Sequence, residues 1–219
     1  MTSAKRPISV LASLFVMLAL VLGLSACGGS TSGSADGTEQ AKQPESSDQK
    51  NDDSDLVIAA ISEVVEAIKN PTEDGLISLL GEDSIEELKN ADIDPCEFYG
   101  RLSRNATYEV NEIAFEGPNK AIVSIAVTNV DTLSTINAAG EYFSEHLDEF
   151  IGDLDYTADD YSDQVNQRLF DYIYDQIDEN DQTVTSNVVL NLSKTGDEWS
   201  LDQNSTAILV NALMGESQN

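Results

Sequence analysis

The stretch 107–128, TYEVNEIAFEGPNKAIVSIAVT, decides the fold, because hydrophobic residues recur at every second position in both of its halves. A period of two is typical of β-strands that bury one face. The residues Gly117-Pro118-Asn119-Lys120 stand between the halves and predict a turn. The alternation slips near Asn111-Glu112, which indicates a β-bulge. The stretch therefore predicts an antiparallel hairpin.

A second hairpin is predicted near the end of the chain. Hydrophobic residues from Val184 to Leu192 fall on one face of a third strand. The residues Thr195-Gly196-Asp197 then predict a turn into a fourth strand, which contains Trp199 and Leu201. Two hairpins give an antiparallel sheet of about four strands.

Helices are predicted before the first hairpin. An apolar stripe at helical spacing runs from Val57 to Ile68, and Asn70-Pro71 ends it. A short helix is expected between Thr72 and Gly81. Ser84 and Glu87 have the spacing of a capping box for the third helix, and Asp94-Pro95 has the residue types that open a fourth.

A short apolar segment, Ile208–Leu213, predicts a final helix after the second hairpin. Helices that come in runs beside an antiparallel sheet, rather than alternating with parallel strands, are typical of the α+β class. We therefore expect N-terminal helices packed on one side of the sheet, within a single domain over residues 55–215.

The segment 141–182 between the hairpins is acidic and aromatic: it has 14 acidic residues, one basic residue and eight aromatic residues. Its second half has the period of an amphipathic helix. One interpretation is that its apolar faces pack on the sheet while the acids face water. The other is that it forms a lid or wall of a pocket. The candidate pocket or interface residues are Tyr142, Tyr156, Tyr161, Tyr172 and Tyr174.

The N-terminus carries the pattern of a secretory signal. Lys5 and Arg6 precede an apolar run from Ile8 to Leu22, and Leu24-Ser25-Ala26-Cys27 follows. These last four residues resemble the bacterial lipobox, whose cysteine receives a diacylglyceryl group. Residues 1–26 are thus expected to be a signal peptide and Cys27 a lipidation site. Two acyl chains hold a protein stably on a bilayer, so we expect an anchor on the outer, extracytoplasmic face of the cell membrane.

The segment 27–54 joins the lipidated cysteine to the domain. It is rich in Gly, Ser, Thr, Asp, Gln and Lys, and Ala35 and Ala41 are its only apolar residues after the cysteine. Such a composition buries too little surface to offset the conformational entropy lost on folding. The segment is therefore predicted to be a flexible tether.

With these elements in place, the chain resembles the cystatin-like α+β roll typified by nuclear transport factor 2. It is similar in particular to Gram-positive bacterial lipoproteins of unassigned activity that carry such a domain. The resemblance implies a curved sheet that encloses a conical cavity with the helices, used as an enzyme pocket, a ligand site or an interface. The motifs that carry it are Ile93-Asp94-Pro95-x-Glu97-Phe98, Tyr108-x-Val110, Ala121-x-Val123, Thr128-Asn129-x-Asp131 and Trp199-x-Leu201-Asp202.

The chain is strongly acidic, with 40 acidic and 11 basic residues and a formal charge of −29. Removing residues 1–26 takes away Lys5 and Arg6, two of the basic residues, so the charge of the remainder becomes −31. This charge argues against nucleic-acid binding and against adhesion through a polybasic patch. It is consistent with simple solubility, or with attraction of cations or cationic partners.

Candidate chemistry is sparse. Cys96 has no partner for an intramolecular disulfide if Cys27 carries lipid, and His146 is the only histidine. The segment from Asp153 begins like a calcium loop, but Ala158 stands where glycine is needed and Gln164 where glutamate is needed. We expect no metal site, because the calcium pattern fails and a single imidazole and one free thiol give no convergent cluster. We expect no cofactor and no catalytic residues, since no phosphate loop or serine elbow is present.

The expected function is therefore a non-catalytic binding or interaction module at the cell envelope. Its partner would be an envelope protein or a small ligand. A solute-binding lipoprotein of a transporter is one alternative, although about 160 residues is short for two lobes. A small enzyme that uses the cavity of the roll is the other.

Overall fold

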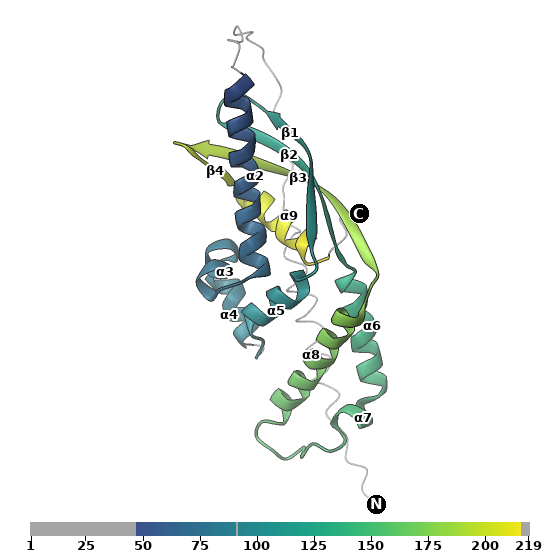
Figure 1. Cartoon of the computed structure of the whole chain (residues 1–219). Helices are drawn as coiled ribbons and strands as arrows, with labels where there is room; N and C mark the ends of the chain where they lie inside the picture. The colour runs from purple at the N-terminus through teal and green to yellow at the C-terminus, as the bar shows by residue number, and fades with distance from the viewer. Residues whose placement is uncertain (1–46, 91, 216–219) are drawn as a thin grey trace, which may run out of the picture.

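The computed structural model describes residues 47–90 and 92–215, with side chains from Asp53 onward. The predicted signal peptide, Cys27 and most of the predicted tether lie outside the described residues. The elements, in chain order, are α2 (Ser47–Lys69), α3 (Glu73–Leu80), α4 (Glu82–Asn90), α5 (Pro95–Ser103), β1 (Thr107–Phe115), β2 (Lys120–Val130), α6 (Thr132–Glu145), α7 (Leu147–Ile151), α8 (Tyr161–Glu179), β3 (Thr183–Thr195), β4 (Glu198–Leu201) and α9 (Gln203–Leu213) (Figure 1). The predicted α+β class is confirmed.

The four strands form one antiparallel sheet in the order β1-β2-β3-β4. The register shifts between Val110 and Glu112, which confirms the predicted bulge. In the centre of the sheet Ile125 pairs with Val110 on β1 and with Val188 on β3. Because side chains alternate along a strand, this register places the buried residues of β2 and β3 on one common face.

That common face carries the core. Val123, Ile125 and Leu190 are fully buried on it, together with Ile61 of α2 and Leu209 of α9. The opposite face of β3 is exposed, as the alternation of buried and exposed residues along the strand shows. Helices thus cover one side of the sheet, as the sequence predicts.

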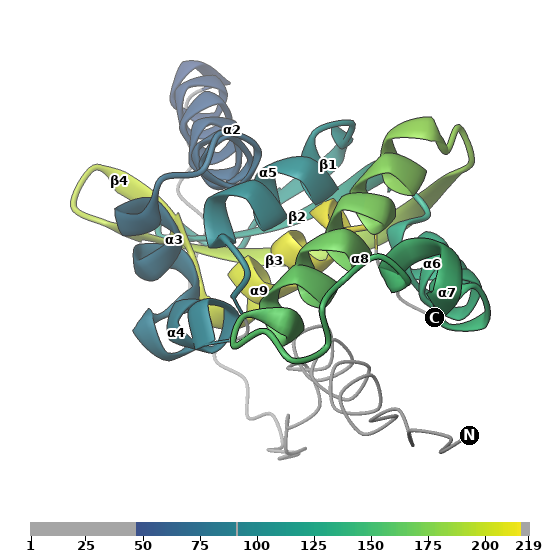
Figure 2. The same cartoon turned by 90° about the horizontal axis from the view of Figure 1, so that it is seen from below.

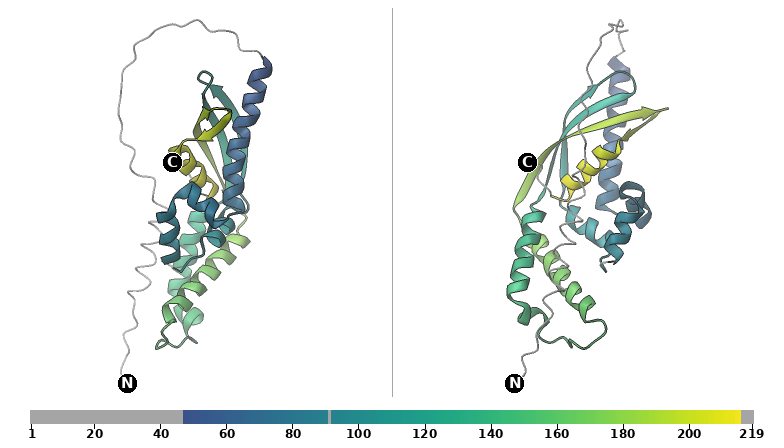
Figure 3. Two further views of the ribbon diagram at one scale, coloured as in Figure 1. Left: turned by 90° about the vertical axis from the view of Figure 1, so that its left-hand side faces the viewer. Right: turned by 180° about the vertical axis from the view of Figure 1, so that it is seen from behind.

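The helices between β2 and β3 continue the hydrophobic core beyond the end of the sheet. The antiparallel pair of α6 and α8, joined through α7, extends beyond the end of the sheet (Figures 1 and 3). Seen from below, α6 and α7 lie on the other side of the view from α3 and α4, and α8 crosses between them (Figure 2). Its inner faces pack on each other and on α5. The interpretation that the apolar faces of the segment 141–182 pack on the sheet is therefore wrong.

Three predicted boundaries are corrected by the structure. The first helix begins at Ser47, so the residues just before Asp55 are helical and not tether. The inserted helices begin at Thr132, nine residues before the predicted start. The predicted capping box at Ser84 is wrong, because α4 already begins at Glu82. The Ser84 hydroxyl donates instead to the carbonyl of Leu80, 3.1 Å away.

The early start of α2 has a structural reason. Asp53 accepts hydrogen bonds from Lys194 Nζ at 2.6 Å and from Trp199 Nε1 at 3.3 Å. These bonds join α2 to the β3–β4 hairpin. Hydrogen bonding by Lys194 holds the pKa of the Asp53 carboxyl below its usual value, since it stabilises the ionised form.

Candidate functional site

An aromatic patch lies on the helical hairpin and consists of Tyr142, His146, Phe150 and Tyr172. The Tyr142 ring stacks on His146 with centroids 3.9 Å apart and on Tyr172 with centroids 5.7 Å apart. Phe150 of α7 closes the group, with its centroid 4.8 Å from that of Tyr172 and 6.3 Å from that of Tyr142. Three helices therefore contribute to one ring cluster.

The patch is partly open to solvent. Tyr142 is 43% exposed, and Tyr172, His146 and Phe150 are half-buried. Beneath them Phe143 is fully buried and stacks on Phe150 at 4.5 Å. Aromatic rings are large apolar surfaces with electron-rich faces, so a partly open cluster of them offers both contact area and an electrostatic preference.

Carboxylates flank the aromatic patch. Glu145 on α6 and Asp175 on α8 each follow a patch tyrosine by three residues, so each carboxylate lies next to that tyrosine on the helix surface. Glu179 lies two turns after Tyr172 on the same face of α8, and all three acids are exposed. Burial and then the nearby acidic groups of Tyr142 and Glu179 raise the pKa of the Tyr172 hydroxyl.

The hairpin tip is held by one arginine. Arg168 of α8 donates to both carboxylate oxygens of Asp153, at 2.6 and 2.9 Å, and to the carbonyl of Phe150. This ion pair keeps the pKa of Asp153 below its usual value. Because Phe150 belongs to the patch, the same arginine fixes the position of a patch ring relative to α8.

The five tyrosines predicted from the sequence do not gather in one place. Tyr142 and Tyr172 lie together, whereas Tyr156 is 77% exposed in the loop before α8 and Tyr161 is half-buried where α8 begins. Tyr174 is 6% exposed and faces α5, with the Arg101 guanidinium 5.3 Å from its ring centroid. Burial raises the pKa of Tyr174 far above its usual value. Tyr174 is thus a packing residue at the base of the hairpin.

The same base is joined by ion pairs. Arg101 Nη1 donates to Asp178 Oδ2 at 3.0 Å, and Arg104 of the same segment binds the other oxygen of that carboxylate. A second carboxylate, Glu97, lies 3.3 Å from Arg101 Nη2. These contacts attach α8 to α5.

A groove of about 500 Å³ lies on another part of the molecule, between α2, α3, β4 and the start of α9. Its volume falls in the range of small-molecule sites. Apolar side chains such as Val64, Leu80 and Trp199 line it, and Glu63 and Gln203 add polar groups. These residues come from four separate segments, so no local sequence pattern identifies the groove in advance.

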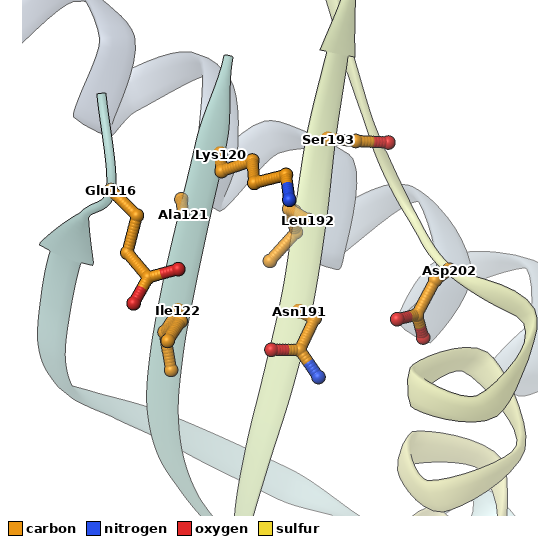
Figure 4. Close-up of a pocket in the computed structure, with 8 residues that line it drawn as sticks. All are labelled: Glu116, Lys120, Ala121, Ile122, Asn191, Leu192, Ser193 and Asp202. Carbon is orange, nitrogen blue, oxygen red and sulfur yellow. The ribbon is translucent and has the colours of Figure 1, made fainter. Parts of the chain in front are cut away.

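A smaller pocket of about 260 Å³ lies on the open side of the sheet. Figure 4 shows Lys120 and Asn191 between Glu116 and Asp202. Asp202 is already engaged, because its carboxylate accepts the backbone N–H of Ser205 at 2.7 Å as the N-cap of α9. The lining is therefore a mixture of charges on an exposed strand surface.

Metal and thiol chemistry find little support in the part of the chain that is described. No group of three or more His, Cys, Asp or Glu side chains could hold a metal ion among those residues. Burial, Asp94 and Glu73 raise the pKa of the Cys96 thiol, which disfavours the nucleophilic thiolate.

Among the described residues, no helix has both the length and the hydrophobicity that a bilayer crossing requires.

No family model and no curated protein matches this chain. Among solved structures it is similar to YcdA, a candidate lipoprotein from Bacillus subtilis, with 17% sequence identity and a TM-score of 0.43. The similarity covers 72% of this chain and 55% of YcdA, so the chain spans about half the length of that protein.

Proposed function

We propose that the protein is an extracytoplasmic lipoprotein, anchored to the cell membrane through Cys27, that acts as a non-catalytic binding module. The lipobox-like stretch Leu24-Ser25-Ala26-Cys27 supports the anchor. The observation that carries the binding role is the aromatic patch on a helical hairpin that extends beyond the end of the sheet (Figure 1).

The position of the aromatic patch favours recognition over folding. The core between sheet and helices is already filled by fully buried side chains such as Phe98, Ile125 and Leu209. Tyr142 contributes little to that core, since 43% of its surface is exposed. Exposed aromatic clusters with a polar surround are typical of interaction surfaces.

A small-molecule ligand is the second candidate, and the groove between α2, α3 and β4 favours it. This version includes the solute-binding component of a transporter. Between residues 47 and 215, however, the described residues build one sheet and no second lobe around a cleft. The interaction module is therefore the preferred proposal. An enzyme would need a catalytic group, and the groove lining offers only Glu63 as an ionisable side chain.

The anchor is tested by Cys27→Ser in the full precursor. We expect this variant to leave the membrane fraction or to stay unprocessed, because a hydroxyl cannot take the thioether-linked diacylglyceryl group. Cys96→Ser is the matched control, since it removes the other cysteine, and it should stay in the membrane fraction with normal lipid labelling. Lipid labelling of the Cys27→Ser variant would contradict the anchor.

The binding role is tested on intact cells with a photo-crosslinking amino acid at position 142. We expect a discrete crosslinked product from this position. The same group at position 133 is the control: Leu133 is 40% exposed, close to the 43% of Tyr142, and lies on the opposite side of α6. Equal products from both positions, or none from either, would contradict binding at the hairpin.

A further inference from the structure

We infer that the aromatic patch and its flanking carboxylates bind a basic peptide segment of a partner protein, with lysine or arginine side chains at both ends of the bound stretch. The inference rests on the proposed binding role and specifies the chemistry of the partner. It draws on the geometry of the hairpin, the properties of aromatic rings and the distribution of charge.

The hairpin arranges the groups in a strip. Tyr142 and Tyr172 lie side by side, with an interplanar angle of 28°. Because α6 and α8 run in opposite directions (Figure 1), Glu145 lies toward the hairpin tip and Glu179 lies toward the sheet. At a rise of 1.5 Å per residue, these two carboxylates are separated by about 15 Å along the hairpin. The strip therefore consists of Glu145 at one end, the two tyrosines in the middle and Glu179 at the other end.

The chemistry of the strip fits a basic segment. Tyrosine faces attract ammonium and guanidinium groups, and the aliphatic stems of lysine and arginine cover aromatic surface while their charged ends reach the rim. In an extended peptide about 15 Å corresponds to roughly five residues. Two basic residues at that spacing can meet both ends of the strip at once.

The charge near the strip is not neutralised from within. Arg168 is the only basic residue of the segment 141–182, and it is already bound to Asp153. At the base of the hairpin Arg101 and Arg104 are both bound to Asp178. A basic partner therefore supplies the positive charge that the hairpin lacks.

A single metal ion fits the strip less well than a basic peptide. An ion draws its ligands within about 2.5 Å of one point, whereas Glu145 and Glu179 lie at opposite ends of the strip. No cluster of three potential ligands forms in the described part of the chain. The two separated carboxylates instead match two basic side chains spaced along an extended peptide.

The test measures binding of two synthetic peptides to the full mature protein in non-ionic detergent at low salt, by calorimetry. One peptide carries lysines on both sides of a four-residue Gly/Ser/Leu centre, which places them five positions apart, and the other carries glutamines there. We expect the lysine peptide to bind at least tenfold more tightly. Its affinity should fall steeply as salt is raised, because salt screens exposed charges.

Variants locate the site. Tyr142→Ala and Tyr172→Ala should each weaken binding of the lysine peptide at least fivefold, whereas Tyr142→Phe keeps the ring and should retain binding. The double variant Glu145→Gln/Glu179→Gln should weaken binding and flatten its salt dependence. Leu133→Ala is the control for loss of exposed apolar surface, and Glu86→Gln/Glu87→Gln on α4 is the control for loss of two charges. Circular dichroism verifies that each variant is folded.

The outcomes separate the alternatives. Equal weakening by the α4 double variant and the hairpin double variant would show attraction by net charge alone and overturn the site. Failure of the lysine peptide to bind, while position 142 still crosslinks on cells, would overturn the basic partner and leave the binding role intact. Absence of both signals would overturn the binding role as well.

Discussion

At the scale of single residues, Asn129 shows how one buried polar side chain joins several elements. It is 1% exposed, and its Nδ2 donates to the carbonyls of Leu102 and Leu213 at 2.8 and 2.7 Å. Its Oδ1 accepts the backbone N–H of Val130 at 2.8 Å. The end of β2 is thereby tied to the C-terminal ends of α5 and α9. Buried polar groups persist where such bonds satisfy them.

We expect Asn129→Ala to lower the free energy of unfolding by about 3 kcal/mol, because two carbonyls and one N–H lose a buried partner. Urea unfolding followed by circular dichroism measures the change. Asn187→Ala is the control, since Asn187 lies on the exposed face of β3, and it should change stability by less than about 0.5 kcal/mol. Similar losses in the two variants would refute the structural role of Asn129.

At the scale of elements, the helical hairpin is an insertion at the point where β2 and β3 stop pairing. Val130 pairs with Thr183, and the next backbone bond joins Asp131 N to Gln182 O at 3.0 Å. Buried side chains between α6 and α8, among them Phe143 and Leu169, continue the hydrophobic core beyond the sheet. Its external attachment is chiefly to α5 through Asp178. This arrangement suits an element that adds a surface without building the sheet.

We expect the sheet to survive replacement of residues 133–181 by a short Gly-containing turn. Thr132 is retained, because its hydroxyl donates to the carbonyl of Met214. The shortened protein should still unfold in one cooperative transition, since the paired strands keep their contacts with α2 and α9. Thermal unfolding compared with the full domain measures this. A broad, non-cooperative transition would show that the sheet needs the hairpin in order to fold.

At the scale of the whole molecule, the excess of acidic over basic residues determines which partners are attracted electrostatically. Among described basic side chains, several already bind acids: Lys89 binds Glu73, Arg168 binds Asp153, and Lys194 binds Asp53. These pairs neutralise few of the 40 acidic residues. The remaining field attracts cationic partners over about one Debye length, roughly 8 Å at physiological ionic strength. The hairpin patch offers such partners a specific point of contact.

Much of the fold follows from local sequence. The bulge near Glu112, the short helix after Thr72 and the N-cap at Asp94 are predicted from the sequence and are confirmed. Each depends on residues only a few positions apart, and such contacts are legible without a fold. Ser84 shows the limit of such local prediction, because its capping pattern is present in the sequence but does not cap a helix. The preceding helix ends nearby, and the Ser84 hydroxyl donates to the carbonyl of Leu80.

The candidate site was only partly predictable. The sequence determined that tyrosines gather in an acidic segment, and by itself it carries the lipobox-like pattern at Cys27. Only the tertiary structure decided that Tyr142 meets Tyr172, while Tyr174 turns to α5. Tyr172 and Tyr174 are two positions apart on α8, so their side chains point about 200° apart around the helix. Which of the two meets α6 depends on how the two helices pack across the hairpin. Periodicity and caps are short-range, whereas the meeting of distant segments is decided by how their apolar faces fit together.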